Sequence, residues 1–234
     1  MTNADDIRSE IGTILSGDWT TRDGAQVPAP EDVQLGNNAV ILTGTVLYAD
    51  LAESTNLVNS YKNWFAAEIY KSFLRGACRV IQKNRGTITA FDGDRVMAVY
   101  IGSTQNTDAV GSALEINHVV TEIINQMVRE RFKLPKFSLR HAVGIDRSQL
   151  FVARTGVRGS NDLVWVGRAA NCAAKLSEIR QGSCVTWITT EVYENMQDSV
   201  KYSKGTRDST CMWEKHNFET LGEVIYGSTW RRPP

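Results

Sequence analysis

Hydrophobic residues recur along this chain with two spacings that alternate from segment to segment. Alternation of apolar and polar residues is typical of strands, and an apolar residue at every third or fourth position is typical of helices. Segments with strand-like spacing are 39–50, 87–100 as a hairpin, 137–145, about 149–155, one ending near Val166, 184–189 and a pair within 216–230. Segments with helical spacing are about 56–84, about 106–131, about 168–180 and 190–197. This interleaving predicts an α+β fold, an α/β sandwich in which helices cover one side of a mixed sheet.

Residues 1–38 follow a different pattern. Four apolar residues early in this segment have helical spacing, and glycine and proline residues follow them. The apolar residues are Ile7, Ile11, Ile14 and Leu15, and the later residues are Gly24, Pro28 and Pro30. We therefore predict a helical leader over 1–38, followed by one folded domain over 39–234.

The composition is that of a folded domain, with 42% hydrophobic and 22% charged residues, and with 26 basic side chains against 26 acidic ones. A balanced charge gives no general attraction to nucleic acid or to a membrane surface. No apolar stretch reaches the roughly 20 residues of a membrane-spanning helix, and Asp5 and Asp6 stand where a secretory signal would be basic. We therefore expect a cytoplasmic protein that binds neither nucleic acid nor membrane.

The chain has four cysteines and three histidines, and none of them has the sequence spacing usual for metal ligands. The cysteines are Cys78, Cys172, Cys184 and Cys211, and the histidines are His118, His141 and His216. We therefore expect free, buried thiols and no zinc site.

Two aspartates stand where apolar strands give way to polar turns, Asp50 in YADLAEST and Asp94 in FDGDRVMAVY. The two-residue period of the first strand puts Tyr48 and Asp50 on one face. A tight turn at Asp92–Gly93 leaves Asp94 at the start of the next strand. If these strands are neighbours, the carboxylates converge and can bind Mg²⁺, which completes its shell with water and phosphate oxygens. The alternative is that Asp50 caps the helix that follows and Asp94 belongs to an ordinary hairpin turn.

The residues that follow Asp50, including Ser54 and Thr55, indicate a turn that runs into a helix. The first backbone N–H groups of a helix are free to bind an anion. We therefore count Ser54 and Thr55 among the candidate nucleotide-binding residues.

A third motif, VWVGRAANCAAKL at 164–176, has a strand that ends at Gly167 and then a helix of small residues. Asn171 and Lys175 are four residues apart and therefore share a helical face. An amide there can orient a sugar or a phosphate, and a cation can neutralise charge that develops during a reaction. The alternative is a helix packed through its alanines, with Asn171 structural and Lys175 solvated.

Together the three motifs resemble those of the class III nucleotidyl cyclases, the family of adenylyl and guanylyl cyclase catalytic domains. The resemblance covers roughly residues 40–230. The form apolar-aromatic-Ala-Asp-Leu is matched at 47–51, and the Gly-Asp turn is matched at Gly93 and Asp94. The last motif is matched by Val166, Gly167, Asn171 and Ala173, with Lys175 where the family has arginine. The resemblance implies a mixed sheet with a ferredoxin-like core and a catalytic domain over 39–234.

The resemblance also implies a metal-dependent cyclisation of a nucleoside triphosphate. Two Mg²⁺ or Mn²⁺ ions would be held by Asp50, Asp94 and the carbonyl of Leu51. Asn171 would orient the ribose, and Lys175 would stabilise charge on the α-phosphoryl group as a point charge, without the bidentate fork of an arginine. Sites of this family form between two catalytic domains, so the resemblance implies a homodimer with two sites.

The positions that read the base depart from the purine cyclases that the chain resembles. Adenylyl cyclases have a lysine four residues before the second aspartate and an aspartate seven before the asparagine, and Ala90 and Val164 stand there in this chain. Neither side chain can form a hydrogen bond, whereas guanylyl cyclases place polar residues at both positions. A purine site built on side-chain hydrogen bonds is therefore not expected. Candidates for pocket walls or base contacts are Tyr48, Ala90, Arg95, Val164, Trp165 and Arg168.

This departure resembles the pyrimidine cyclases of the bacterial Pycsar antiphage systems. That resemblance implies conversion of UTP to 3′,5′-cyclic UMP and pyrophosphate, triggered by phage infection. It also implies that a separate effector reads the product, either a TIR-domain protein or a membrane-spanning protein. Three alternatives remain open: a cytidylate cyclase that makes cyclic CMP, a purine cyclase with an unusual pocket, and a catalytically silent nucleotide-binding dimerisation module.

Overall fold

The computed structural model describes residues 2–157, 160–220 and 222–234. The chain forms two compact units, each of which combines two stretches of sequence. The first unit is Met1–Thr43 with Gln149–Gly167, and the second is Gly44–Ser148 with Arg168–Pro234. Among the described residues, no helix is both long enough and apolar enough to cross a membrane.

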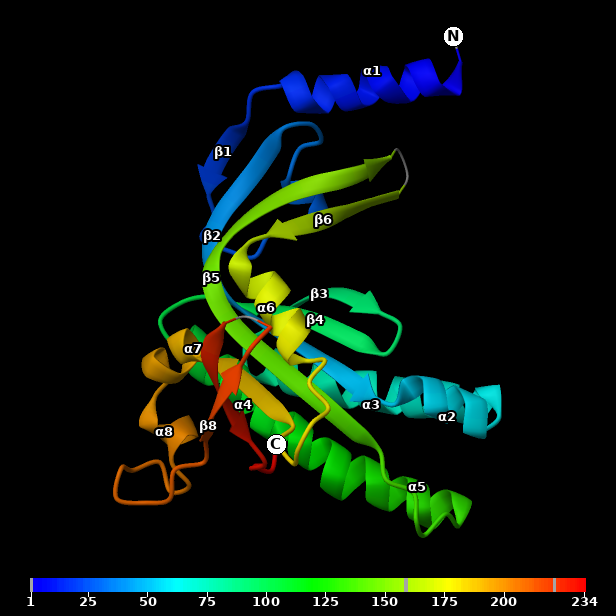
Figure 1. Ribbon diagram of the computed structural model, residues 1–234, viewed down its shortest axis with the longest axis vertical. Coiled ribbons are helices and arrows are strands. Elements are labelled where there is room, and N and C mark those ends of the chain that lie inside the picture. The colour runs from blue at the N-terminus through cyan, green and yellow to red at the C-terminus, as the bar shows by residue number, and fades with distance from the viewer. Residues whose placement is uncertain (1, 158–159, 221) are drawn as a thin grey trace. The chain divides into compact units, whose positions relative to one another are not determined.

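A mixed sheet organises the second unit (Figure 1). Its strands are β2 (Asn38–Ala52), β3 (Thr87–Asp92), β4 (Arg95–Tyr100), β5 (Arg140–Val157), β7 (Thr186–Thr189), β8 (Glu214–Phe218) and β9 (Glu223–Ser228). They lie in the order β3-β4-β2-β5-β7-β9-β8. β5 and β7 are parallel, whereas β2 and β3 pair antiparallel with β4, and β7 and β8 pair antiparallel with β9. The predicted α+β class with a mixed sheet is confirmed.

Helices of the second unit pack on this sheet or on one another. They are α2 (Ser54–Ser60), α3 (Asn63–Lys83), α4 (Gln105–His118), α5 (Asn125–Phe132), α6 (Arg168–Leu176), α7 (Thr190–Asn195) and α8 (Asp198–Lys201), and a π-helical turn η2 (Val119–Ile124) joins α4 to α5. In α3, Phe65, Ile69 and Phe73 are buried about one turn apart, which gives the helix one apolar side.

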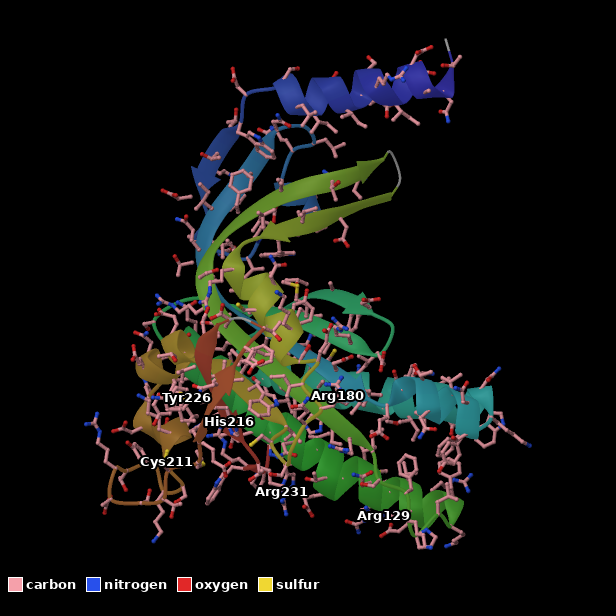
Figure 2. The ribbon with its side chains drawn as sticks, viewed as in Figure 1. Arg129, Arg180, Cys211, His216, Tyr226 and Arg231 are labelled. Carbon is pink, nitrogen blue, oxygen red and sulfur yellow. The ribbon has the colours of Figure 1, made fainter. Side chains whose placement is uncertain are left out.

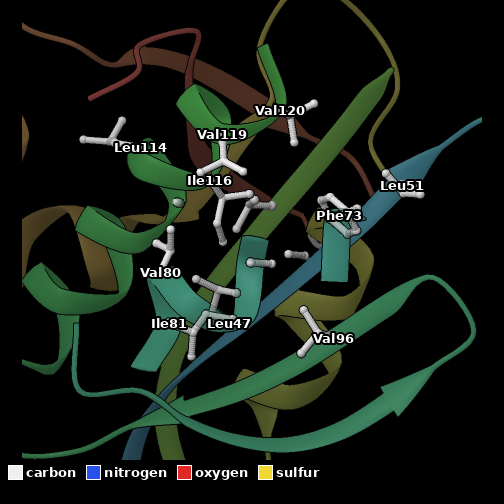
Figure 3. Packing of buried hydrophobic residues seen from close by; sticks show 14 of the residues in the cluster. Leu47, Leu51, Phe73, Val80, Ile81, Val96, Leu114, Ile116, Val119 and Val120 are labelled. Carbon is white, nitrogen blue, oxygen red and sulfur yellow. The ribbon is translucent and has the colours of Figure 1, made fainter. Parts of the chain in front are cut away.

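The main hydrophobic core lies between one face of the sheet and helices α3 and α4 (Figure 3). The strand residues that contribute to it are Leu47, Ala49, Leu51, Val96, Ala98, Tyr100, Val143, Ile145 and Ile188. These residues alternate along their strands, so the residues between them point to the opposite face.

Helix α6 packs on that opposite face. A Cβ atom added to Gly144 of β5 would lie 2.1 Å from the carbonyl oxygen of Ala173 and 2.5 Å from the nitrogen of Ser177. Only a residue without a side chain lets the backbone of α6 approach the strand this closely. A second, smaller apolar cluster contains Leu176, Cys184, Trp187 and Ile225. Helices therefore cover both faces of the sheet, not the single face that the sequence predicted.

The first unit contains α1 (Asn3–Ser16), β1 (Thr20–Asp23), a short 3₁₀ helix η1 (Pro30–Asp32), β6 (Ser160–Val166) and the adjoining parts of β2 and β5. β1 pairs in parallel with β2, and β6 pairs antiparallel with β5. Helix α1 begins at a capping box formed by Thr2 and Asp5, and it confirms the predicted leader helix. The predicted boundary between 1–38 and 39–234 stays a prediction.

Several predicted elements have different bounds in the structure. The helix predicted over about 56–84 is two helices, α2 and α3, because Tyr61 and Lys62 between them have extended backbone conformations. The strands predicted over 137–145 and about 149–155 are one strand, β5. The polar strand β1 was not predicted, because TTRD shows no apolar alternation.

The helix predicted over about 168–180 ends at Leu176. The residues that follow leave the helical path, and Gly182 has a φ of 74°, a left-handed conformation that glycine adopts without strain. The polar run at 180–183 therefore lies in a bent loop, not in the last turn of a helix.

Candidate active site

Strand β2 brings Tyr48 and Asp50 to the face of the sheet that carries α6. Their neighbours Leu47 and Leu51 point into the main core, so Tyr48 and Asp50 point away from it. Asp50 lies opposite Arg95 of β4, and only 10% of the Asp50 side chain is exposed. The carboxylate therefore projects from a rigid inner strand of the sheet.

Asp94 lies beside Asp50, in the turn between β3 and β4. Gly93 before it has a φ of 59°, which a residue with a side chain adopts only under strain. The Oδ2 atom of Asp94 is buried and has no hydrogen-bond partner among the described residues. Burial raises the pKa of Asp50 and the charge of Asp94 raises it further, while Arg95 and Arg180 oppose the shift. The two carboxylates are thus close enough to repel each other, as the strand pairing predicts.

Two arginines contact the Asp50 carboxylate. The Nε atom of Arg95 lies 3.6 Å from Oδ1, and an Nη atom of Arg180 lies 2.7 Å from Oδ2. The same Arg180 nitrogen donates to the carbonyl oxygen of Leu51 at 3.3 Å. Arg95 also forms an ion pair with Glu178, with 3.4 Å between nitrogen and oxygen. The segment after α6, where Figure 2 labels Arg180, is therefore fastened to β2 and β4.

The carboxylates of Asp50 and Asp94 and the carbonyl of Leu51 fit a divalent metal ion. All three groups offer oxygen, the donor that Mg²⁺ and Mn²⁺ prefer. The buried, unpaired oxygen of Asp94 is a group that a cation would satisfy. Arg180 bonds to the other two groups. Its guanidinium must move before a metal ion can take the same oxygens.

Helix α6 presents Asn171 and Lys175 on its exposed side. The hydroxyl of Ser148 accepts a hydrogen bond of 2.9 Å from the backbone nitrogen of Ala169 and caps the start of the helix. The buried side is formed by Ala169, Ala170, Cys172, Ala173 and Leu176. Within the part of the chain that the structure describes, neither Asn171 nor Lys175 has a hydrogen-bond or ion-pair partner. Both side chains are available to a molecule outside their own chain.

Two of the candidate base contacts lie together on this face. The guanidinium carbon of Arg95 is 5.9 Å from the centre of the Tyr48 ring, a cation–π distance. Burial raises the pKa of Tyr48, although Arg95 opposes the shift, so the phenol keeps its proton as a hydrogen-bond donor. Ala90 pairs with Met97 in the neighbouring β3–β4 hairpin.

The other predicted nucleotide-binding residues of the second unit are Ser54, Thr55 and Arg168, and the part of Ser54 and Thr55 in anion binding stays a prediction. Ser54 and Thr55 begin α2. Arg168 forms ion pairs with the buried Asp146, at 3.3 Å, and with Glu223. These contacts give Arg168 a structural part within the second unit, and its part in base binding stays a prediction.

Val164 and Trp165, the remaining candidates, belong to β6 of the first unit. In that strand they pair with Ala153 and Val152 of β5. Their part in a nucleotide pocket stays a prediction.

Arg180 is the residue of this site that the sequence did not single out. A helix over about 168–180 would have made it an ordinary helical surface residue. The available signal was the polar run Arg180–Ser183 with its glycine, which favours a turn over a helix.

No family model matches the chain. Proteins named uridylate cyclase resemble it over almost its whole length. One from Xanthomonas perforans is 47% identical over 229 residues, covering 97% of this chain and 96% of that protein. One from Burkholderia cepacia is 45% identical over 233 residues, covering 99% of each. One from Rhodovulum sp. (strain MB263) is 40% identical over 240 residues, covering 100% of this chain and 99% of that protein.

Solved structures of purine cyclases share the fold. A bacterial light-regulated adenylyl cyclase has a TM-score of 0.69 at 17% identity, covering 87% of this chain and 56% of that one. The adenylyl cyclase CyaB from P. aeruginosa has a TM-score of 0.66 at 19% identity, covering 83% of this chain and 97% of that one. The guanylyl cyclase Cya2 has a TM-score of 0.65 at 18% identity, covering 83% and 95%. At these identities the likeness shows the fold alone.

The sequence relatives show the family, and the solved structures show that its fold is the fold of the class III cyclases. The chain therefore belongs to the uridylate cyclase family and is a nucleotidyl cyclase.

Proposed function

We propose that this nucleotidyl cyclase converts UTP to 3′,5′-cyclic UMP and pyrophosphate. The observation that carries the proposal is the pair of adjacent carboxylates, Asp50 and Asp94, of which Asp94 has a buried and unpaired oxygen. Relatives named uridylate cyclase support UTP as the substrate.

Asp50, Asp94 and the carbonyl of Leu51 would hold two Mg²⁺ or Mn²⁺ ions. When bound, the ions lower the pKa of the ribose 3′-hydroxyl and neutralise the triphosphate. In the reaction, the 3′-hydroxyl releases its proton to solvent and its oxygen bonds to the α-phosphorus, while the bond from the α-phosphorus to the oxygen that bridges it to the β-phosphorus breaks. The leaving group is pyrophosphate.

Asn171 and Lys175 serve the same reaction from a second copy of the chain. Both are exposed on α6 and lack partners among the described residues of their own chain. In a homodimer, Asn171 orients the ribose and Lys175 offsets the charge that develops on the α-phosphoryl group. A symmetric dimer of this kind contains two equal sites.

The residues at the sequence positions that read the base favour a pyrimidine. Ala90 and Val164 offer no side-chain hydrogen bond at the two positions that read adenine in adenylyl cyclases. Tyr48 and Arg95, by contrast, place an aromatic face and a cation next to Asp50. The hydrogen-bonding edge of a purine would find no matching donor or acceptor on the side chains of Ala90 and Val164. Leaving polar groups of the substrate unpaired in this way strongly lowers its binding.

The alternatives give different products. A cytidylate cyclase would use the same carboxylates on CTP, and the names of the relatives favour UTP. Membership in a family of named cyclases favours an active enzyme over a silent dimerisation module.

We extend the proposal to antiphage defence in the cytoplasm. The support is the resemblance to the pyrimidine cyclases of Pycsar systems. The product would then be read by a separate effector, either a TIR-domain protein or a membrane-spanning protein.

The experiment is an assay of the purified protein with Mn²⁺ and ATP, GTP, CTP or UTP, each supplied separately. We expect cyclic UMP and an equal amount of pyrophosphate from UTP. Asp50→Asn should abolish both products, because it removes a carboxylate charge from the metal ligands. The matched control is Asp92→Asn, an exposed aspartate of the same hairpin, which should keep most of the activity.

Each other result has a definite meaning. Cyclic CMP as the main product would show that the substrate is CTP and not UTP. A cyclic purine nucleotide as the main product would contradict the inference that Ala90 and Val164 disfavour a purine. Equal loss of activity in Asp50→Asn and Asp92→Asn would contradict a special role for the Asp50 carboxylate.

A further inference from the structure

A cavity of about 650 Å³ lies between the segment that follows α6 and the β8–β9 hairpin. Lys175 and Arg180 line part of it, and Cys184, Glu214 and His216 line it as well. Arg180 and His216 are both labelled in Figure 2. The proposed cyclase reaction uses Lys175. It does not use the Cys184 thiol, the Glu214 carboxylate or the His216 imidazole.

These three groups converge from distant parts of the sequence. One ligand atom from each of Cys184, Glu214 and His216 lies within 4.8 Å of the others. Glu214 and His216 are two residues apart on β8 and therefore point to the same face. Cys184 lies just before β7, and β9 runs between β7 and β8.

Gly227 of β9 makes this convergence possible. It is paired with both Trp187 of β7 and Glu214 of β8. A Cβ atom on Gly227 would lie 2.9 Å from the sulfur of Cys184 and 2.6 Å from the Trp187 ring. The missing side chain leaves room for the Cys184 thiol to reach across β9 toward β8.

His216 carries the clearest sign of a missing partner. Its Nε2 atom is buried and has no hydrogen-bond partner in the ranges that the structure describes. This nitrogen lies 3.8 Å from a carboxylate oxygen of Glu214, too far for a hydrogen bond. The Trp187 ring packs edge-on against the imidazole, with 5.0 Å between ring centres, and holds its orientation. A buried, unpaired nitrogen is costly unless something binds it.

We propose that Cys184, Glu214 and His216 form a binding site for a transition-metal ion, with Zn²⁺ as the ion that best suits this donor set. Thiolate, imidazole and carboxylate are the usual protein ligands of Zn²⁺, whereas Mg²⁺ takes oxygen donors only. Three protein ligands leave a fourth position for water or a small ligand in the cavity. A metal ion at this site fastens the segment 177–184 to β8.

Binding of a metal ion forms the metal–sulfur bond at Cys184 and releases the proton of its thiol to solvent, so metal affinity depends on pH.

Sequence spacing predicted no zinc site, because Cys184 is far along the chain from Glu214 and His216. The ligands meet only through the sheet order, which carries β9 between them. A short ligand motif therefore never appears in the sequence.

The test is a titration of chelator-treated full-length protein with Co²⁺, in the absence of nucleotide. Cobalt occupies zinc sites and reports a bound thiolate by a charge-transfer band in the ultraviolet. We expect this band at about one equivalent of Co²⁺, its loss when Zn²⁺ is added, and a Zn²⁺-dependent rise in the melting temperature. Cys184→Ser should abolish the band, and His216→Gln should weaken Co²⁺ binding by at least about tenfold.

Cys211→Ser is the matched control, because Cys211 is an exposed thiol outside the cluster. It should keep the cobalt band unchanged. Absence of the band in the unsubstituted protein, its persistence in Cys184→Ser or its loss in Cys211→Ser would each overturn the proposal. If Cys184→Ser does not fold, the half-exposed His216→Gln and the exposed Glu214→Gln decide the question, since undiminished Co²⁺ affinity in both would contradict the site. No nucleotide enters this experiment, so its result is independent of the proposed UTP reaction.

Discussion

Arg180 supplies the positive charge nearest to the Asp50 carboxylate, at 2.7 Å, and it also bonds to the Leu51 carbonyl. These are two of the three groups that we assign to metal binding. A metal ion and the Arg180 guanidinium therefore compete for the same oxygens, and the side chain acts as a counter-ion that must move aside. The Arg180 side chain is 31% exposed, so it can reach solvent when it leaves.

Arg180→Ala should consequently strengthen Mn²⁺ binding to the nucleotide-free protein. The Mn²⁺ affinity should rise roughly fivefold. This corresponds to about 1 kcal/mol, the usual size of a partly exposed ion pair such as Arg180–Asp50, which would no longer compete with the metal ion. The same substitution should lower stability without metal, because the buried Asp50 loses a partner. Calorimetry or Mn²⁺ electron paramagnetic resonance measures the affinity.

Arg75→Ala, an exposed arginine of α3, is the control and should change neither the Mn²⁺ affinity nor the stability. Weaker Mn²⁺ binding in Arg180→Ala would show that Arg180 supports the metal ligands instead of competing with the ion.

His141 gives a second prediction at the scale of single residues. Burial, together with the nearby charge of Arg180, lowers the pKa of His141 from 6.5 to about 3. Between these two values the unfolded chain binds a proton that the folded chain does not. Folding stability should therefore fall as the pH is lowered through this window, by up to about 1.4 kcal/mol per pH unit from this residue.

Denaturant unfolding of the parent protein and of His141→Gln, at several pH values between about 7 and about 5, measures this contribution. The parent should lose stability more steeply than the variant as the pH falls. Parallel pH dependences would show that His141 is not held neutral by the fold.

At the scale of elements, the position of α6 depends on its contact with β5. The backbone of α6 lies so close to Gly144 that an added Cβ would stand 2.1 Å from the Ala173 carbonyl oxygen. The helix carries Asn171 and Lys175, and the segment after it carries Arg180. Gly144 therefore sets the distance between the sheet and α6, and with it the positions of Asn171 and Lys175.

Gly144→Ala should displace α6, lower stability by about 3 kcal/mol through overpacking, and reduce cyclic UMP synthesis more than the loss of folded protein explains. Thermal unfolding and activity per folded molecule are the two measurements. Gly12→Ala is the control, because no atom lies within 4 Å of a Cβ there and alanine favours the helix α1. Equal behaviour of the two variants would refute the close contact.

The periodic elements of the site could be predicted from the sequence. The two-residue period of β2 placed Tyr48 and Asp50 on one face, and the four-residue spacing on α6 placed Asn171 and Lys175 on one exposed side. Both inferences depend only on local geometry, which the sequence contains.

The contacts made after each element ends could not be predicted. Arg180 reaches Asp50 because α6 stops at Leu176, and helix ends are set by tertiary contacts as much as by propensity. Cys184 meets Glu214 and His216 through the order of the strands, which no local pattern encodes.

At the scale of the whole molecule, the proposed chemistry needs two chains. Asp50 and Asp94 have side-chain partners or neighbours within their own chain, whereas Asn171 and Lys175 are exposed and have none among the described residues. A self-complementary dimer that presents α6 of each chain to the carboxylates of the other would complete both sites. We propose that UTP is cyclised at such a shared site.

The most direct test of that claim co-expresses two differently tagged, individually inactive chains, Asp50→Asn and Asn171→Ala, and isolates dimers that carry both tags. Such a dimer contains one site with neither substitution and one site with both. It should make cyclic UMP from UTP at about half the rate of the unsubstituted dimer, although each homodimer is inactive. Mixed dimers that are as inactive as the two homodimers would contradict a shared site, because the carboxylates and Asn171 would then have to act from the same chain.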